Sequence, residues 1–433
     1  MSRTKFTLII LGTILIMGLF GWIGYVYFSN KNATDNTALT VRDFFPFGRP
    51  SPAAPVTEPG NTIGQPTQTD TTGPYVPPRL RKITTFAVAG FIPLTKEREL
   101  PPVIDPLTGL PKPLKPKEKP KTETIPLVRF TARSNGNVYE VGSDSQEQTT
   151  VSSTYIPKIY EALFGGRGDN VIFRYLDENN NVQSYLATVP KRDSTIKDLV
   201  GTFLPENILN ISISPDTTKY FYLFKTGETT SGIVGTFGAT PKTQVFSHAF
   251  SEWTSAWIDA KKILFTTKPS SGISGFAYTL DTQTKLFSKI LGDKKGLIIL
   301  PNKDGKQMLF SESGVGSIVA KILTLTPRGE QQLGIRTFAE KCVWGKDPII
   351  MYCAIPKSIP SVPLPDSWYQ GVISFDDNLW RVNTQTGIYE LLADPMKDSS
   401  EEIDVTNMAL DDTESLLYFI NKKDATLWSL NIK

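Results

Sequence analysis

Short apolar segments alternate with polar turns at a nearly constant interval over most of the chain. From about residue 127 onward, each interval holds a hydrophobic segment, a turn with Asp or Asn, and a second segment rich in aliphatic and aromatic residues. The second segments centre on Phe130, Phe173, Tyr222, Leu264, Leu309, Tyr352 and Tyr418. Successive centres lie 43, 49, 42, 45, 43 and 66 residues apart. A period of about 40–45 residues, with four strands in each unit, is typical of a β-propeller blade.

Seven such units predict an all-β protein with a seven-bladed β-propeller, and six blades are the alternative because the borders of the first unit are soft. The last unit ends at Lys433, directly after its third strand. We expect an N-terminal segment such as residues 83–89 to supply the fourth strand, since closing the ring removes exposed strand edges. The predicted propeller therefore spans residues 83–433.

Residues 6–28 form an uncharged, mostly apolar stretch of 23 residues that follows Arg3 and Lys5. As a helix this stretch would be about 34 Å long, enough to cross a hydrocarbon core of roughly 30 Å. A signal peptide is the alternative, but its apolar core is normally about 7–15 residues and lacks the aromatic belt found near residue 28. The positive-inside rule then predicts a single-pass cell-membrane protein with residues 1–5 in the cytoplasm and the propeller outside it.

Two proline-rich segments lie between the predicted membrane helix and the repeats. Residues 29–82 are predicted to be a disordered stalk, because residues 43–78 carry nine prolines and almost no apolar periodicity. Residues 101–126 carry eight prolines and repeated lysines, and form a predicted insertion in the first unit. Its lysines fit attachment to anionic wall polymer or phospholipid head groups, or a loop that they merely keep solvated.

Several motifs indicate a resemblance. Residues 213–221 read Ile-Ser-Pro-Asp-x-x-Lys-x-Phe, which is similar to the Ser-Pro-Asp-Gly-x-x-Ile repeat of TolB-like and WD40-like bacterial propellers. The order of anchor, stalk and repeats, with segments 156–163, 170–178 and 368–375, resembles uncharacterised membrane-anchored propeller proteins of small-genome, candidate-phylum bacteria. The resemblance implies a tethered propeller and no known activity.

The chain has two cysteines, Cys342 and Cys353, which flank one turn within a repeat. They fall on two strands that should be antiparallel neighbours, where facing Cβ atoms come within disulfide range. An even count outside the cytoplasm favours a bridge, and two reduced core cysteines are the alternative.

Catalytic motifs are missing from the sequence. The single histidine, His248, is predicted on the surface or on an outer strand, and no zinc, Ser-His-Asp or Cys-x-x-Cys motif occurs. The adjacent acidic pairs are Asp177-Glu178, Asp376-Asp377, Glu401-Glu402 and Asp411-Asp412. Neighbouring side chains on a strand point to opposite faces, and most of these pairs fall in predicted turns. We therefore expect no catalytic residue, no metal and no cofactor.

The sixth unit is about twenty residues longer than the others, and the surplus is residues 356–371. This loop is stiffened by prolines and contains Pro365, Asp366, Trp368 and Tyr369. A stiff loop that carries Trp and Tyr loses little entropy on binding and offers a large contact area, so these four residues are candidate binding residues. In the alternative, the loop covers the channel or an edge and Trp368 is buried.

These features predict a non-catalytic, membrane-tethered extracytoplasmic propeller that serves as a binding or scaffold module for an envelope protein or a cell-wall or surface polymer. The net charge of +3, without a basic stripe, argues against nucleic acid. The alternative is an extracytoplasmic polysaccharide-acting hydrolase or lyase with carboxylates at the propeller channel. Three or more Asp, Glu, Tyr or Arg side chains that converge on one central funnel, with two carboxylates about 5–10 Å apart, would favour that enzyme.

Overall fold

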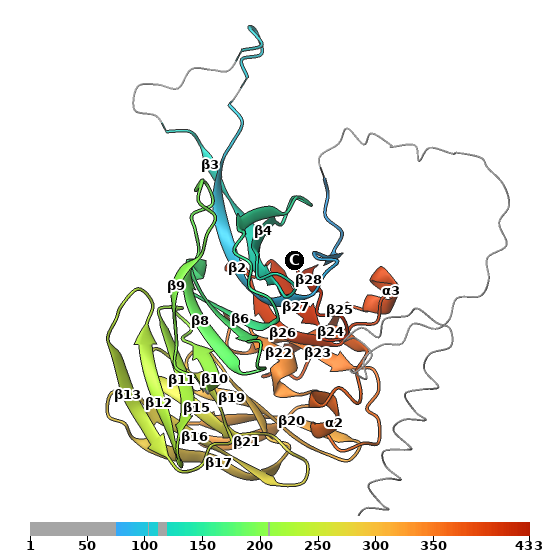
Figure 1. Cartoon of the computed structure of the whole chain (residues 1–433). Coiled ribbons are helices and arrows are strands. Elements are labelled where there is room, and N and C mark those ends of the chain that lie inside the picture. The colour runs from blue at the N-terminus through green and yellow to red at the C-terminus, as the bar shows by residue number, and fades with distance from the viewer. Residues whose placement is uncertain (1–74, 103, 111–118, 207) are drawn as a thin grey trace, which may run out of the picture. The chain divides into compact units, whose positions relative to one another are not determined.

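A computed structural model describes residues 75–433 except 103, 111–118 and 207. This part of the chain forms seven four-stranded antiparallel sheets, the blades of a propeller (Figure 1). The prediction of an all-β protein with seven blades is confirmed.

The blades follow one another along the chain. Blade 1 contains β2 (Val88–Glu99), β3 (Thr122–Ala132), β4 (Val138–Gly142) and β5 (Thr149–Ser152). Blade 2 contains β6 (Ile159–Gly165), β7 (Asn170–Leu176), β8 (Val182–Thr188) and β9 (Val200–Phe203). Blade 3 contains β10 (Ile208–Ile213), β11 (Lys219–Thr226), β12 (Thr229–Thr236) and β13 (Lys242–His248). Blade 4 contains β14 (Trp253–Trp257), β15 (Lys262–Thr267), β16 (Ser274–Asp281) and β17 (Phe287–Lys295).

The remaining blades have the same order. Blade 5 contains β18 (Ile298–Pro301), β19 (Gln307–Gly314), β20 (Ser317–Leu325) and β21 (Arg328–Gln332). Blade 6 contains β22 (Cys342–Trp344), β23 (Ile350–Pro356), β24 (Asp377–Asn383) and β25 (Tyr389–Ala393). Blade 7 contains β26 (Val405–Leu410), β27 (Leu416–Asn421), β28 (Leu427–Asn431) and the N-terminal strand β1 (Leu80–Lys82). The short helices are η2 (Gly166–Gly168), η3 (Ala339–Lys341), α2 (Asp366–Tyr369) and α3 (Pro395–Ser399).

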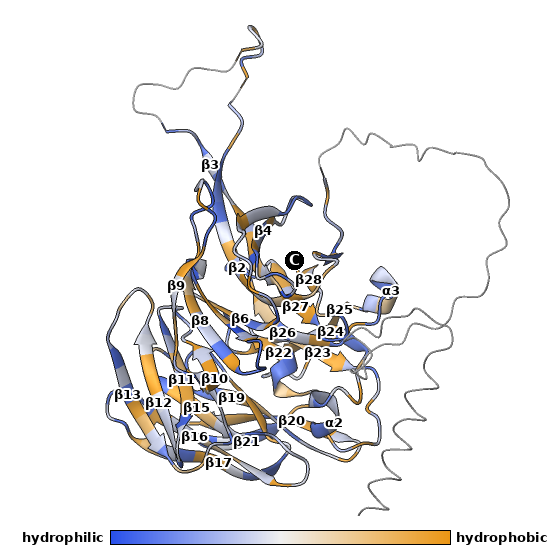
Figure 2. Cartoon of the chain, in the orientation of Figure 1, coloured by the Kyte–Doolittle hydropathy of each residue, from blue (hydrophilic) through white to orange (hydrophobic). Residues whose placement is uncertain are grey.

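The first strand of each blade lies at the centre of the ring, where β2 contacts β6 and β26, and β10 contacts β6 and β14. The apolar centres of the sequence repeat are the second strands, which neighbouring blades cover on both faces. Phe173, Phe265 and Phe310 on three of these strands are completely buried, each at a gain of about 2–3 kcal/mol. Figure 2 shows the corresponding hydrophobic segments along the strands. Burial on both faces explains why these strands are continuous apolar runs rather than alternating ones.

The ring is closed by the N-terminal strand β1, which pairs with β28 so that Leu80 faces Leu430 and Lys82 faces Trp428. Closure by an N-terminal piece was expected, but with residues 83–89. The closing strand lies just before that segment, because Val88 already begins the innermost strand of blade 1. Leu80 is buried among side chains of blades 6 and 7, so the folded ring also includes residues that were assigned to the stalk.

The proline- and lysine-rich insertion begins after one strand of a long hairpin, β2, and ends within the other, β3. Strands β2 and β3 pair from Val88 and Ala132 out to Glu99 and Thr122, well beyond the rest of blade 1 (Figure 1). The end of the predicted insertion 101–126 is therefore strand rather than loop. Lys112, Lys115 and Lys117 of its lysine run lie outside the described residues.

No helix among the described residues, which begin at residue 75, is long and apolar enough to cross a membrane. The predicted membrane span 6–28 lies outside them.

Candidate functional site

The candidate residues of the long blade 6 loop lie on or beside the short helix α2, between β23 and β24. Trp368 is only 2% exposed, and its Nε1–H donates a hydrogen bond to Asp404 Oδ2 at 2.8 Å. Its ring lies 5.3 Å from that of Phe338, and the ammonium groups of Lys341 and Lys422 lie 5.1 and 5.0 Å from its centre. The ring of Trp368 thus packs against an apolar side chain and two cations, and its N–H has an acceptor. All of these partners belong to this chain.

A buried charge cluster lies beneath Trp368. The Nζ atom of Lys341 is 2.6 Å from Asp377 Oδ2 and 2.6 Å from Asp404 Oδ1, and all three side chains have no exposed surface. Lys341 also donates to the carbonyl of Val405 at 2.8 Å. Burial raises the pKa of Asp377 to about 6, and the nearby Lys341 ammonium opposes the rise. The cluster joins η3, β24 and the start of blade 7, so it holds blades 6 and 7 together.

The other residues of the loop anchor it to neighbouring blades. Asp366 accepts hydrogen bonds from the Ser270 hydroxyl at 2.9 Å and the Ser271 backbone N–H at 2.7 Å, both in blade 4. Pro365 is buried. Tyr369 is 45% exposed, and its hydroxyl donates to Glu340. Of the four candidate binding residues, three are held against the fold and only Tyr369 presents a large surface to solvent. The geometry therefore favours the covering interpretation of this loop.

Cys342 and Cys353 are joined by a disulfide, with their Cα atoms 4.1 Å apart. They face each other directly across β22 and β23. The bridge lies in the same blade as the anchored loop, and no free cysteine remains.

Pairs of carboxylates occur, but lysines bridge them. Besides the buried cluster, Lys357 Nζ lies 2.9 Å from both Asp376 and Asp394. Asp177 accepts hydrogen bonds from the backbone of Asn179 and Asn181 and so closes a turn. Among residues 75–433, leaving out 103, 111–118 and 207, no group of three or more His, Cys, Asp or Glu could hold a metal ion.

A second aromatic region lies where blades 3 and 4 meet. We call it the aromatic groove. It is a cavity of about 730 Å³ whose aromatic lining is His248, Phe250, Trp253, Phe276, Tyr278 and Phe287. His248 ends the outermost strand of blade 3, and the other residues come from the following loop and from β14, β16 and β17. Phe276 and Tyr278 share one face of β16 because they are two residues apart.

The rings of the aromatic groove form a connected surface. Phe250 lies edge-on to Trp253 at 4.8 Å between ring centres, and Tyr278 stacks on Phe287 at 4.7 Å. Trp253 is buried as the floor, with its Nε1–H bonded to the carbonyl of Phe250 at 3.0 Å. On the rim, Phe250 is 40% exposed and Ile273 is 74% exposed. This leaves apolar surface open to solvent beside a rigid floor.

Two hydrogen-bond donors border these rings. The backbone N–H of Phe250 donates to His248 Nδ1 at 2.9 Å, so the proton of the neutral imidazole is on Nε2. The side chain of Tyr278 also lines the cavity, and its hydroxyl can donate a hydrogen bond. At the rim, Glu252 forms an exposed ion pair with Lys268 at 2.8 Å, and this bond lowers the pKa of Glu252. The aromatic groove thus offers apolar faces, two donors and one acidic side chain.

The sequence placed His248 on the surface or an outer strand, and it is indeed exposed on β13. The aromatic groove itself was not predicted. The available signal was the aromatic spacing in residues 246–253, where Phe246, His248, Phe250 and Trp253 follow closely. That spacing does not show which rings face outward, because the partners Phe276, Tyr278 and Phe287 come from later strands.

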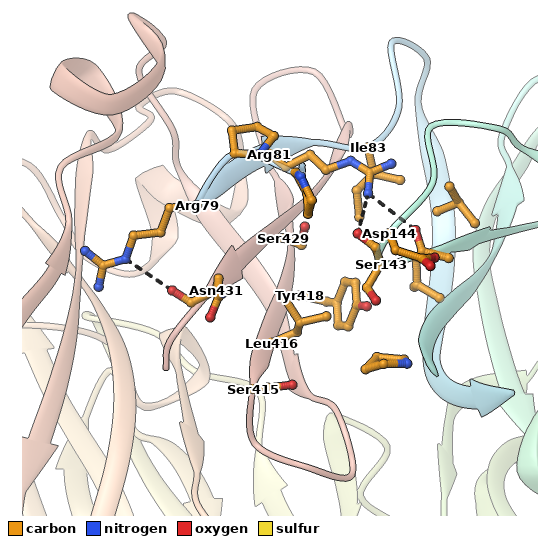
Figure 3. Close-up of a pocket in the computed structure, with 16 residues that line it drawn as sticks. Arg79, Arg81, Ile83, Ser143, Asp144, Ser415, Leu416, Tyr418, Ser429 and Asn431 are labelled. Carbon is orange, nitrogen blue, oxygen red and sulfur yellow. Dashed lines mark hydrogen bonds between the residues drawn. The ribbon is translucent and has the colours of Figure 1, made fainter. Parts of the chain in front are cut away.

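A smaller cavity of about 280 Å³ lies at the seam between blades 7 and 1 (Figure 3). Arg81 on β1 points across this seam and donates to the carbonyls of Ser143 at 3.3 Å and Ser145 at 2.5 Å. Arg79 donates to the carbonyl of Asn431 at 3.3 Å, and Tyr418 is buried, which raises its pKa. The arginines of this cavity are already used to close the ring, so we assign the seam a structural role.

Three solved structures illustrate what the fold is similar to. TolB from Acinetobacter baumannii is 13% identical with a TM-score of 0.40, and the match covers 58% of this chain and 58% of that one. Oligogalacturonate lyase in complex with manganese is 10% identical with a TM-score of 0.48, covering 80% and 99%. The β-propeller domain of the Trilobed protease from Pyrococcus furiosus is 11% identical with a TM-score of 0.41, covering 60% and 78%.

The chain spans little more than half the length of the TolB chain it matches. No family model matches the chain. No curated protein matches it either. At these identities and TM-scores, the similar structures carry no argument about function.

Proposed function

We propose that this protein is a non-catalytic binding or scaffold module, in which a propeller head tethered to the cell membrane by residues 6–28 acts outside the cytoplasm. Its partner is an envelope protein or a cell-wall or surface polymer, bound in the aromatic groove. The observation that carries this proposal is the open, rigid aromatic surface with two available donors at the junction of blades 3 and 4. Exposed aromatic side chains on a rigid scaffold are the usual anchors of binding surfaces.

The polysaccharide-acting enzyme requires two carboxylates that flank a substrate. In the described part of the chain, Asp377 and Asp404 share the buried ammonium of Lys341, and Asp376 and Asp394 share that of Lys357. A lysine therefore occupies the position between each pair that a sugar or water would need. Neither of these two carboxylate pairs therefore supports the enzyme over the binding module.

The tether is tested by adding protease to intact spheroplasts. We expect loss of the propeller and a short membrane-bound stub, because the positive charges before residues 6–28 predict that the head is outside. A head that resists this protease while lysed cells lose it would overturn the outside location.

The aromatic groove is tested by capture of envelope components with the full-length chain. Phe250→Ala should reduce capture at least about tenfold, since losing an aromatic hot spot costs about 2 kcal/mol or more. The control is Ile388→Ala, which removes an apolar side chain of blade 6 that is also exposed, at 66%. Equal capture by the two variants would overturn the aromatic groove as the binding site.

A further inference from the structure

We propose that the aromatic groove binds a polyproline-type segment, and that the segment is residues 49–55 of a second copy of this chain. This inference rests on the proposed binding function and names the partner.

The chemistry of the aromatic groove matches a polyproline ligand. Such a segment has no internal hydrogen bonds, its prolines carry no N–H donor, and its carbonyl oxygens point outward as acceptors. Aromatic-lined grooves bind these segments through ring faces and side-chain donors. Here Phe250, Tyr278 and Phe287 supply the faces, while His248 Nε2–H and the Tyr278 hydroxyl supply the donors. A sugar would instead require many donors and acceptors, and this lining is mostly apolar.

The chain itself contains a matching segment. Residues 49–55 read Arg-Pro-Ser-Pro-Ala-Ala-Pro, which includes a Pro-x-x-Pro pattern next to a positive charge. At the rim of the aromatic groove, Glu252 is already paired with Lys268, so the match between groove and segment rests on the prolines rather than on Arg49.

The position of the aromatic groove favours a second copy over the chain's own segment. The described chain joins the ring at the seam between blades 7 and 1, and the aromatic groove lies at the junction of blades 3 and 4, almost opposite. For a head of this length the path around the surface is about 70 Å, from the usual scaling of domain size. The roughly twenty residues from Pro55 to Tyr75 span about 25 Å as a flexible coil and about 62 Å as extended polyproline. A linker that cannot comfortably span two sites gives almost no intramolecular binding.

The first measurement uses a fluorescent peptide of residues 46–58 and the full-length chain in detergent. The chain carries Pro50→Ala, Pro52→Ala and Pro55→Ala, so that its own segment does not compete. We expect binding at micromolar concentrations, and at least about tenfold weaker binding when Phe250→Ala is added or when Pro50, Pro52 and Pro55 of the peptide are alanine. Tyr278→Phe keeps the ring and removes only the hydroxyl, so it should weaken binding severalfold, and Ile388→Ala should have no effect.

The second measurement is the mass of the full-length chain as a function of concentration. We expect association of the unchanged chain, and monomers for both the triple proline variant and Phe250→Ala. Mixing these two variants should restore a dimer, because one supplies an intact segment and the other an intact groove. A chain that stays monomeric at every concentration, with peptide binding only when its own prolines are replaced, would overturn the second copy in favour of the chain's own segment.

Absence of peptide binding to the triple proline variant would overturn the inference altogether. The proposed function would survive that result if Phe250→Ala still reduced capture of envelope components relative to Ile388→Ala. Equal capture by those two variants would instead remove the function as well, so the two failures can be told apart.

Discussion

The blade 6 loop and the aromatic groove are both rich in aromatic side chains, yet they differ in how much ring surface and how many hydrogen-bond donors are accessible to a ligand. Trp368 in the loop is 2% exposed, and its indole N–H already has the acceptor Asp404. In the aromatic groove, Phe250 is 40% exposed and two donors nearby are open to a ligand. An aromatic residue beside prolines therefore does not by itself mark a binding surface. Unused donors next to exposed rings are the better sign.

The largest expected effect tests the charge cluster under the loop. Lys341→Met leaves Asp377 and Asp404 buried without their cation, and should lower the free energy of unfolding by about 3–5 kcal/mol. The measurement is denaturant unfolding of the full-length chain. Lys357→Met is the matched control, because it removes a partly exposed lysine that bridges two carboxylates, and should cost no more than about 1 kcal/mol. Equal losses for the two lysines would mean that the cluster does not anchor the loop.

The second prediction compares two neighbours on α2. Trp368→Ala removes a buried ring and should lower the free energy of unfolding by about 3–4 kcal/mol, with a fall in melting temperature of several degrees. Tyr369→Ala removes a side chain that is 45% exposed and should cost about 1 kcal/mol or less. Calorimetry of both variants checks this. If Trp368→Ala keeps the melting temperature but loses a partner, the loop is a recognition element after all.

The third prediction concerns the disulfide beside the loop. Cys342 and Cys353 are 11 residues apart, and closing so short a loop in the unfolded chain should contribute about 3 kcal/mol. Replacing both cysteines by alanine and measuring unfolding tests the magnitude. Thiol labelling of freshly isolated, denatured protein without reductant tests the bond, and labelled cysteines would contradict it.

The fourth prediction uses pH to separate the two regions. Asp377 takes up its proton at about pH 6 in the folded protein, and at its ordinary pKa of 3.8 when unfolded. Between these values the folded state binds more protons, so this group's stabilising contribution is complete below about pH 4 and is lost as pH rises through about 6. The loss is at most about 3 kcal/mol. Asp377→Asn should remove this pH dependence, whereas Phe250→Ala should follow the unchanged protein at every pH.

The smallest expected effect on stability is in the aromatic groove. Phe250→Ala should change the free energy of unfolding by about 1 kcal/mol or less, because much of the ring is already in contact with water. Thermal unfolding checks this against Trp253→Ala, which removes the buried floor and should cost about 3 kcal/mol or more. A large loss for Phe250→Ala would show that the aromatic groove is part of the core, and would remove the contrast with Trp368.

The seven blades could be predicted from the sequence because their second strands are buried on both faces. Buried residues such as Phe173 and Phe265 therefore recur with the period of the fold. The closing strand was placed a few residues too late, since a three-residue strand is too short to show a period. The length of the blade 6 loop was visible, but its packing depends on Lys341 and Asp404, which are distant in the chain. The aromatic groove combines strands of two blades, and side-chain exposure at such a junction follows from packing rather than from any local pattern.

The closure of the ring also has a mechanical consequence. The described chain enters the head through β1, which three residue pairs hold to β28. Tension applied to the chain before β1 therefore reaches the ring at this three-residue strand before it reaches any complete blade. Arg81 adds resistance to this tension, because it donates hydrogen bonds to backbone carbonyls of blade 1 across the seam (Figure 3). Under increasing force, we expect β1 to separate from β28 first. The other six blades would stay folded, so the strand could pair again when the force is removed.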